Sequence, residues 1–349
     1  MTEASAAGPP RSAPRLVASL AVLSAAALLA LMVGPVDLGI GAVLRELADR
    51  LPFVDLSSGL SEQDATILLE LRLPRVVLGG LVGATLAFAG AAYQGVFRNA
   101  LADPYLLGVA AGAGLGATLA IAYLPAVSGW PIDPIPVAAF AGAIAGVAAT
   151  YVLGRSGTRA RTTTSLVLAG VAVASFFTAV QTYVQQRESA TLRQVYSWIL
   201  GRLGTVGWDE VVLILPYVAI SAAVIVLHRR LLDVLSVGDE EAESLGVRAG
   251  RVRLVVVGAA TLGTAAAVAV SGLIGFVGII VPHAVRLIFG TGYRIVLPLS
   301  IILGAAFMIL TDLAARTAAA PAELPIGVIT AFLGAPFFLL VLQRTRRPV

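Results

Sequence analysis

The longest uncharged run in the chain covers residues 254–285, thirty-two residues without an Asp, Glu, Lys or Arg side chain. A bilayer core is about 30 Å thick, and a helix crosses it in about 20 residues at about 1.5 Å each. The run is therefore too long for one upright crossing. Its middle contains Gly272, Gly275 and Gly278, where one helix can end and the next can begin. We expect two membrane-spanning helices here.

The composition agrees with a membrane protein. Hydrophobic residues make up 58% of the 349 and charged residues only 13%, whereas soluble domains average about 45–50% and about 25%. Further uncharged runs long enough to cross are residues 16–36, 76–97, 104–132, 134–154, 162–186, 211–227, 295–311 and 324–343. The fold class we predict is an all-α integral membrane protein of about ten transmembrane helices.

The distribution of arginine supports ten crossings instead of nine. All 24 basic residues are arginines. With the N-terminus inside and ten spans, sixteen arginines lie inside and eight outside; with nine spans the division is twelve and twelve. Because basic residues concentrate in cytoplasmic loops, we expect both termini to be cytoplasmic. Residues 1–15 and 344–349 are then cytoplasmic tails, and residues 16–343 are a single ten-helix domain in the lipid bilayer.

The absence of certain residue types excludes several kinds of chemistry. A P-loop needs a lysine for the nucleotide phosphates, and this chain has none. There is no cysteine, and the only histidines are His228 and His283. Thiolate chemistry and Cys/His zinc sites are thus excluded or nearly so. We predict no catalytic residue, no metal site, no cofactor and no nucleic-acid partner, and we expect His283 to serve packing and hydrogen bonding.

Small residues recur at helical spacing in two of the runs. Gly108, Gly112 and Gly116 form one ladder, and Gly79, Gly83 and Ala87 form another. Such ladders let helices approach closely in lipid, so we expect tight helix packing at both.

Three charged residues at the ends of the uncharged runs have expected partners or positions. Asp312 and Arg316 have i,i+4 spacing at the end of a run, as expected of a pair. Arg286 lies at the inner end of its run, so two alternatives remain: it snorkels toward the cytoplasmic face, or it is paired inside the bundle.

The polar segments contain three constellations. Residues 37–75 read as an outer loop with a short amphipathic helix near 41–51, and this loop ends with Arg72 and Arg75. With Arg316 these arginines either receive carboxylates of an extracytoplasmic partner or anchor the interface. Residues 229–253 form a charged cytoplasmic segment, either a short helix that docks into a soluble partner or a solvated loop. Residues 98–104 form a tight inner turn.

Six blocks occur in order: LRLPRVVLGGLVGATLAFAGAAYQGVFRNALADPYLLGVAAGAGLGA, SLVLAGVAV, WILGRLG, GDEEAESLGV, SGLIGFVGIIVPHAVRLIFG and AELPIGVITAFLGAPFFLLVL. From about residue 71 to 342, the chain resembles the permease family of bacterial binding-protein-dependent ABC importers for ferric siderophores, haem and cobalamin. The resemblance implies ten helices per subunit in a bacterial inner membrane and a homodimer or a pair of related permeases. The implied partners are two cytoplasmic ATPase subunits and an extracytoplasmic substrate-binding protein.

The resemblance also implies roles for particular residues. Arg72, Arg75 and Arg316 match the positions that receive the binding protein. Asn99 and Leu101 match the inner turn that narrows the pathway, and Thr163 and Thr164 complete that gate. The family's Asn-Pro-Leu turn reads Asn99-Ala100-Leu101 here. The ATPase-coupling segment comprises residues 239–247, with Asp239, Glu240, Glu241, Glu243, Leu245, Gly246 and Val247 as its site residues.

Two other functions remain as alternatives. A secondary transporter would need no ATPase, but the uncharged runs lack an Asp/Glu/His relay of the kind that proton-coupled carriers use. A non-transporting membrane scaffold would need no pathway. The sequence does not select among a siderophore, haem and a corrinoid as substrate.

Overall fold

The fold is a bundle of apolar helices. The computed structural model describes the chain except for residues 1–11, 35, 37, 51–58, 125–132, 156–162, 205–206 and 346–349, which include most of both predicted tails. In the described part all regular structure is helical, which confirms the all-α fold class. The long apolar helices are α1 (Ser12–Met32), α4 (Leu73–Phe97), α5 (Val109–Tyr123), α6 (Pro134–Arg155), α7 (Thr163–Arg187), α9 (Asp209–Leu227), α12 (Ala249–Ser271), α13 (Val277–Phe289), α14 (Tyr293–Thr317) and α15 (Ile326–Thr345).

These helices match the predicted runs. Seven candidate spans in the described chain are long and apolar enough to cross a membrane, and α5, α13 and α15 are shorter apolar helices. Helices form here because hydrocarbon offers no partner for backbone N–H and C=O groups, which a helix satisfies internally. The predicted division of residues 254–285 is confirmed, since α12 ends at Ser271 and α13 begins at Val277.

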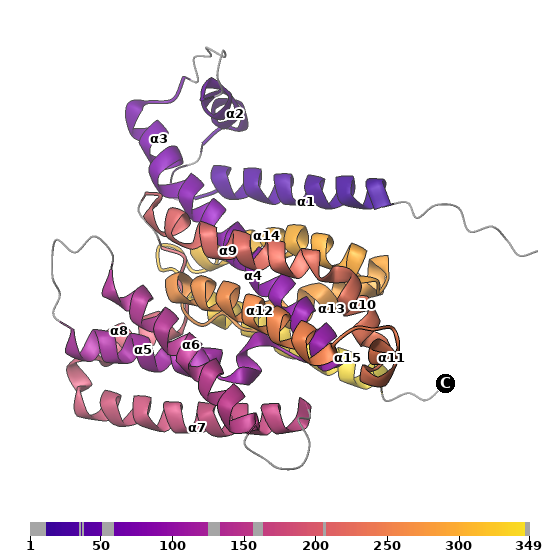
Figure 1. The fold of residues 1–349 in the computed structure, drawn as a ribbon. Helices are drawn as coiled ribbons and strands as arrows, with labels where there is room; N and C mark the ends of the chain where they lie inside the picture. Colours follow the sequence, from indigo (N-terminus) through magenta and orange to yellow (C-terminus); the bar gives the residue numbers. More distant parts are fainter. Residues whose placement is uncertain are drawn as a thin grey trace, which may run out of the picture.

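Helix α4 lies at the centre of the bundle (Figure 1) and packs against α9, α12, α13 and α14. In the most apolar 18-residue stretch of Glu62–Phe97, which includes α4, 83% of the residues are buried. The corresponding stretch of α7, at the edge of the bundle, has 17% of its residues buried. The small-residue ladders explain the close packing. A Cβ on Gly83 would lie 2.3 Å from the Gly304 carbonyl oxygen of α14, and one on Gly112 would lie 2.1 Å from the Gly142 carbonyl oxygen of α6. Only glycine permits these approaches.

Short helices occupy the segments between the spans. They are α2 (Ile40–Asp49), α3 (Glu62–Thr66), the π-helix η1 (Ile67–Arg72), the 3-10 helices η2 (Pro104–Leu107) and η3 (Ser189–Thr191), α8 (Leu192–Ile199), α10 (Arg229–Val237) and α11 (Asp239–Ser244). The amphipathic helix expected near residues 41–51 is present as α2. The expectation of a water-exposed loop up to residue 75 was wrong in its second half. There α3, η1 and α4 form one continuous helical rod, and Arg72 is buried.

The two ends of the bundle carry different charged elements. Figure 1 shows α3 at one end of the central helix and α11 at the other, with the start of α1 and the end of α15 on the α11 side. The charged segment 229–253 is helical: α10 and α11 fold into a short pair that leads into α12. We call the α3 side the outer end and the α11 side the inner end. The compartments to which they belong stay a prediction.

Candidate sites at the two ends of the bundle

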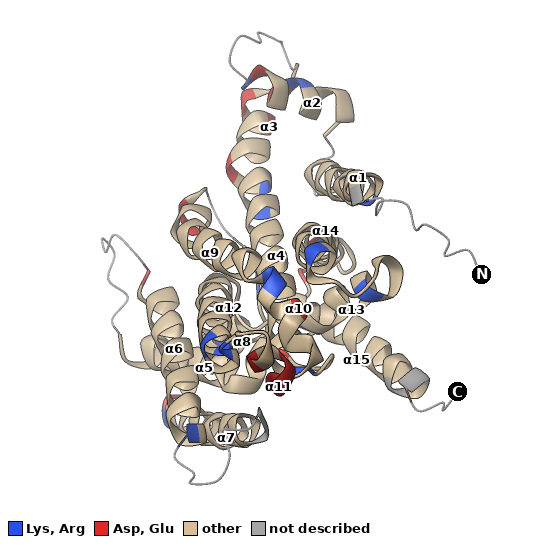
Figure 2. Cartoon of the chain, turned by 45° about the vertical axis from the view of Figure 1, so that its right-hand side comes forward, with Lys and Arg blue, Asp and Glu red and all other residues tan. Residues whose placement is uncertain are grey.

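The inner end presents an acidic helix to its surroundings. Gly238 separates α10 from α11, and Figure 2 shows the acidic residues of α11 in red below α10. Its residues Glu240, Glu241 and Glu243 are exposed, and Leu245 is 70% exposed just beyond its end. Gly246 takes a left-handed conformation with φ of +78°, which lets the Val247 amide donate to the Ala242 carbonyl oxygen at 2.9 Å. Every predicted coupling residue therefore lies on or beside one compact turn of chain.

Asp239 joins this turn to two spans. Its carboxylate accepts hydrogen bonds from Arg253 Nη2 on α12 at 3.0 and 3.1 Å. It also lies 3.7 Å from Arg98 Nη2, at the end of α4. The coupling segment is thus in direct contact with the inner ends of both α4 and α12.

The predicted gate turn begins at the same arginine. Arg98 ends α4 with φ of +50°, and the side chain of Asn99 accepts a hydrogen bond from the Leu101 amide at 2.9 Å. The Ala102 amide donates to the Asn99 carbonyl oxygen at 3.0 Å. These bonds stabilise the turn without the proline that Ala100 replaces. Thr163 and Thr164 are the first two residues of α7, and their side chains lie outside what the structure describes.

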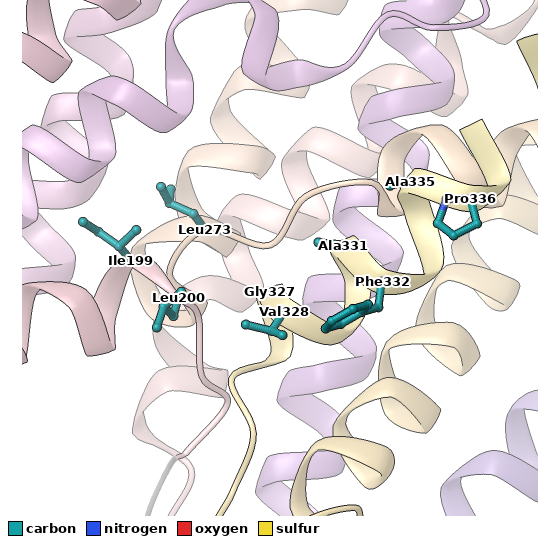
Figure 3. A pocket seen from close by; sticks show the side chains of 9 residues that line it. All are labelled: Ile199, Leu200, Leu273, Gly327, Val328, Ala331, Phe332, Ala335 and Pro336. Carbon is teal, nitrogen blue, oxygen red and sulfur yellow. The ribbon is translucent and has the colours of Figure 1, made fainter. Parts of the chain in front are cut away.

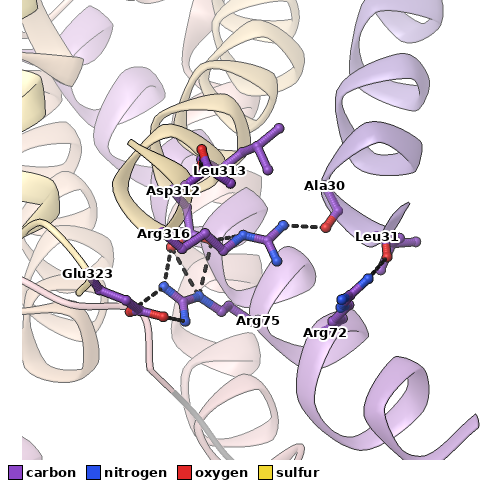
Figure 4. Close-up of polar contacts among 9 residues, drawn as sticks. Ala30, Leu31, Arg72, Arg75, Asp312, Leu313, Arg316 and Glu323 are labelled. Carbon is purple, nitrogen blue, oxygen red and sulfur yellow. Dashed lines mark hydrogen bonds and ion pairs between the residues drawn. The ribbon is translucent and has the colours of Figure 1, made fainter. Parts of the chain in front are cut away.

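At the outer end, Arg75 and Arg316 pair with the carboxylates of Asp312 and Glu323. Arg72 lines the same hollow but bonds to the first helix, and we call all five residues the outer cluster (Figure 4). Arg75 donates to Asp312 at 2.9 to 3.1 Å and to Glu323 at 3.0 Å. The predicted pairing of Asp312 with Arg316 is confirmed at 3.7 Å. The Arg75 hydrogen bond, more than any other effect, lowers the pKa of the exposed Glu323 carboxyl.

Arg72 and Arg316 also bind the first helix. Arg72 Nη1 donates to the carbonyl oxygens of Leu31 at 2.7 Å and Met32 at 3.0 Å, and its Nη2 donates to that of Val36. Arg316 donates to the Ala30 carbonyl oxygen. Carbonyls in the last turn of a helix have no partner within the helix, so these arginines cap α1. Sequence reasoning missed this role because the two segments are far apart along the chain.

The arginines of the outer cluster line one hollow. Its volume is about 730 Å³, and Arg72, Arg75 and Arg316 contribute to its wall together with Glu323. Three arginines and two carboxylates carry a net charge of +1 in this cluster. The hollow therefore offers net positive charge at the outer end of the bundle.

Within the bundle, the structure decides between the two alternatives for Arg286. Its Nη1 donates to Gln94 Oε1 on α4, and its Nη2 lies 3.3 Å from the Tyr293 hydroxyl. Arg286 is thus paired inside the bundle. Gln94 also donates to the Gly278 carbonyl oxygen at 3.0 Å, so it holds the first turn of α13 against α4.

His283 packs edge-on against Phe337 of α15, with 5.8 Å between ring centroids. This contact fits the packing role expected of it. In the part of the chain that the structure describes, no group of three or more His, Cys, Asp or Glu residues is arranged to hold a metal ion.

A second hollow lies beside α15. Its volume is about 610 Å³, and its lining is apolar, with Leu200, Leu273, Val328 and Phe332 among the residues in Figure 3. Phe332 is 76% exposed. The Tyr105 hydroxyl donates to the Ile274 carbonyl oxygen at 3.0 Å and accepts from its amide at 3.1 Å, which fixes the segment that carries Leu273.

Comparison with known proteins identifies related chains. A sequence model of the FecCD transport family matches residues 22–344. The cobalamin import system permease protein of Halobacterium salinarum is 42% identical over 288 residues, 82% of this chain and 76% of that protein. The hemin transport system permease protein of Yersinia pestis is 39% identical over 293 residues, 80% of this chain and 84% of that protein.

A solved structure shows the same architecture. It is described as an inward-facing conformation of a metal-chelate type ABC transporter. Its TM-score is 0.81 at 26% identity, and the match covers 95% of this chain and 99% of that one.

Proposed function

This chain belongs to the FecCD transport family and is a permease subunit of an ABC importer, and we propose that it works as a homodimer in a bacterial inner membrane. Two cytoplasmic ATPase subunits bind its inner end, and an extracytoplasmic binding protein delivers substrate to its outer end. ATP hydrolysis belongs to the partner chain, because this one has no lysine for a P-loop.

The observation that carries the proposal is the position of Asp239. Its contacts with Arg98 and Arg253 join the exposed acidic helix α11 to the inner ends of α4 and α12. A displacement of α11 by a bound ATPase therefore acts on the turn at Asn99 and Leu101, which we propose to be the cytoplasmic gate together with Thr163 and Thr164. Such a switch of the open side is the step that alternating access needs.

The proposed docking of the binding protein is supported by the outer cluster. Arg72, Arg75 and Arg316 line one hollow, and arginine forks bind carboxylates in two-point contacts. Glu323 is the exposed partner of Arg75. We propose that carboxylates of the binding protein compete with Glu323 for Arg75 at this surface.

The substrate we propose is a ferric siderophore, haem or a corrinoid. The relatives above are named for cobalamin and hemin, and the solved structure for a metal chelate. These are bulky compounds, and the apolar hollow beside α15 is our candidate for a wall of their path. In the homodimer the path lies between the two copies.

Transport is tested with the permease, its ATPase and its binding protein in proteoliposomes. We expect uptake that requires ATP and loaded binding protein. Uptake driven by an ion gradient without ATPase would favour a secondary transporter. ATPase activity that does not change when loaded binding protein is added would favour a non-transporting scaffold.

Docking of the ATPase is tested by reversing charge on α11. The double variant Glu240→Arg with Glu241→Arg should reduce co-purification of the ATPase about tenfold or more, since like charges then face the partner. The matched control, Glu62→Arg with Asp209→Arg, reverses two exposed carboxylates at the outer end and should leave recovery unchanged. Equal recovery from both variants would refute the assignment of α11.

Capture of the binding protein is tested at the outer cluster. Arg72→Glu with Arg75→Glu should weaken capture, but it also removes internal contacts. Arg75→Lys keeps the charge while losing the two-point fork. We expect it to retain more capture than the double reversal at equal thermal stability. Capture at the wild-type level by the double reversal would count against docking here.

A further inference from the structure

A basic pocket opens at the inner end, apart from the coupling turn and the outer cluster. It lies where α6 ends and where α7 and α12 begin, and its volume is about 350 Å³. Tyr151 and Arg155 of α6, Ser165 of α7, and Arg251, Arg253 and Leu254 of α12 are among its lining residues, none of which is acidic. Pockets that hold small ligands or their headgroups start at about 300 Å³, so this inner basic pocket is large enough for one.

Two of the three arginines are held in place by neighbours. Arg155 lies over the Tyr151 ring, 5.0 Å from its centroid, and donates to the Tyr151 hydroxyl at 3.2 Å. Arg253 is oriented by Asp239 at 3.0 Å, while its Nε is buried and has no hydrogen-bond acceptor in the described part of the chain. A buried donor without an acceptor destabilises the folded chain. The guanidinium groups of Arg155 and Arg253 are thus held at the pocket by neighbouring side chains.

The backbone adds to the positive potential. Helix α12 begins at Ala249, and neither its first turn nor that of α7 contains an acidic residue. The N-cap residue of α12 makes no side-chain capping bond. Helix N-termini carry about half a positive charge and bind anions through free amides, so they reinforce the field of the arginines.

The surroundings of the pocket indicate the kind of anion. Val152 and Leu153 next to Arg155 are 64% and 57% exposed, and Leu254 next to Arg253 is 47% exposed. Apolar side chains face outward directly beside arginines where a membrane surface begins. A free phosphate would gain nothing from this apolar border, whereas the acyl chains of a lipid would cover it.

We propose that the inner basic pocket binds the phosphate headgroup of an anionic phospholipid from the inner leaflet. Guanidinium forks match phosphate oxygens in two-point contacts, and basic pockets between spans at the cytoplasmic side are suited to lipid headgroups. Arg253 contributes to the pocket and to Asp239, so the bound phosphate and the coupling segment share one guanidinium. The proposal does not depend on the transported substrate or on any partner chain.

The test is native mass spectrometry of the purified full chain titrated with dioleoyl phosphatidylglycerol or dioleoyl phosphatidylcholine. We expect phosphatidylglycerol to bind at least about tenfold more tightly. Arg155→Gln with Arg251→Gln should abolish that difference. The matched control, Arg230→Gln with Arg294→Gln, removes two charges from the inner end outside the pocket and should change the affinity less than about twofold. Equal losses in both variants would mean a diffuse charge effect and would overturn the site.

Two further measurements on the unmutated chain keep the proposal testable if a variant folds poorly. A photoreactive phosphatidylglycerol should label residues 151–155 or 250–254, and labelling confined to other segments would overturn it. Inorganic phosphate at 10-fold excess over the lipid should not displace it; displacement would assign the pocket to a free anion instead.

Discussion

Arg75 holds the outer cluster together through its ion pairs with Asp312 and Glu323. It contacts both carboxylates of the cluster, and the Asp312 side chain that it neutralises is only 4% exposed. Breaking a buried ion pair by removing one partner costs about 3–5 kcal/mol, because the other charge stays buried. Arg316 remains 3.7 Å from Asp312 and offsets part of this loss.

We therefore predict that Arg75→Gln lowers the free energy of unfolding by about 2–4 kcal/mol. Thermal unfolding in detergent measures the effect. Adding Asp312→Asn to Arg75→Gln should recover part of the loss, since the buried Asp312 charge is then gone as well. The control Arg202→Gln changes an exposed arginine at the same end and should leave the melting temperature unchanged. A melting temperature unchanged by Arg75→Gln would contradict the role given to this ion pair.

Glu323 makes the outer cluster sensitive to acid. The pKa of its carboxyl is lowered from 4.5 chiefly by the hydrogen bond from Arg75. Its stabilising contribution is therefore complete above pH 4.5 and is lost as pH falls through the lower folded-state value. The side chain is 54% exposed, so the contribution is at most about 1 kcal/mol.

We predict that wild type melts slightly above Glu323→Gln at pH 7 and that the gap closes below pH 4.5. Melting curves of both proteins between pH 7 and pH 3.5 test this. A gap that persists or grows in acid would show that Glu323 does not stabilise the cluster as a carboxylate.

At the scale of elements, the small-residue ladder between α5 and α6 confirms the close packing expected from sequence. Gly112 approaches Gly142, and Gly116 approaches Ala138, so closely that an added Cβ would lie 2.1 Å from a carbonyl oxygen at either position. Spacing along one helix identified the ladder. It did not identify α6 as the partner, because any helix with a small-residue face fits a ladder equally well.

We predict that Gly112→Ala destabilises the protein by about 1–3 kcal/mol, the usual cost of overpacking. Gly258→Ala on α12 is the matched control, since nothing lies within 4 Å of its added Cβ. There alanine should be neutral or stabilising by up to about 1 kcal/mol through helix propensity. Thermal unfolding of both variants decides the matter, and similar melting temperatures would refute the packing argument.

The rod of α3, η1 and α4 shows why one segment was misread. Residues 62–72 contain charged side chains at both ends of an apolar stretch, which is typical of a loop or of a helix end. Arg72 is tolerated as a buried residue of η1 because it donates hydrogen bonds to the last carbonyl oxygens of α1. That compensation lies in another helix, so composition alone could not reveal it.

At the scale of the molecule, the central helix α4 connects the two proposed docking surfaces. Arg75 near its start belongs to the outer cluster, and Arg98 at its end contacts Asp239 of the coupling segment. A change at either surface thus reaches the same helix.

The topology is testable because the chain contains no cysteine. We predict that Ser61→Cys and Ala322→Cys react with a membrane-impermeant maleimide on intact cells. Ser244→Cys should react only after permeabilisation. All three positions are exposed in the chain itself, so in cells that produce the permease without its ATPase, access depends on the side of the membrane. Equal labelling of Ser244→Cys and Ala322→Cys in intact cells would contradict the proposed orientation.

The sequence by itself determined the all-α membrane fold, the run boundaries and the division of residues 254–285. Each follows from local composition, because a chain in hydrocarbon must satisfy its backbone within helices. It also identified the pair of Asp312 and Arg316, since i,i+4 neighbours on a helix meet wherever the helix packs.

Only the tertiary structure decided which distant residues meet. Arg75 and Asp312 are 237 positions apart, and Arg286 meets Gln94 across 192 positions. The inner basic pocket likewise takes residues from three helices. Many helix arrangements bury the same apolar runs equally well in lipid. The polar contacts between helices, which the order of residues does not reveal, are specific to one arrangement.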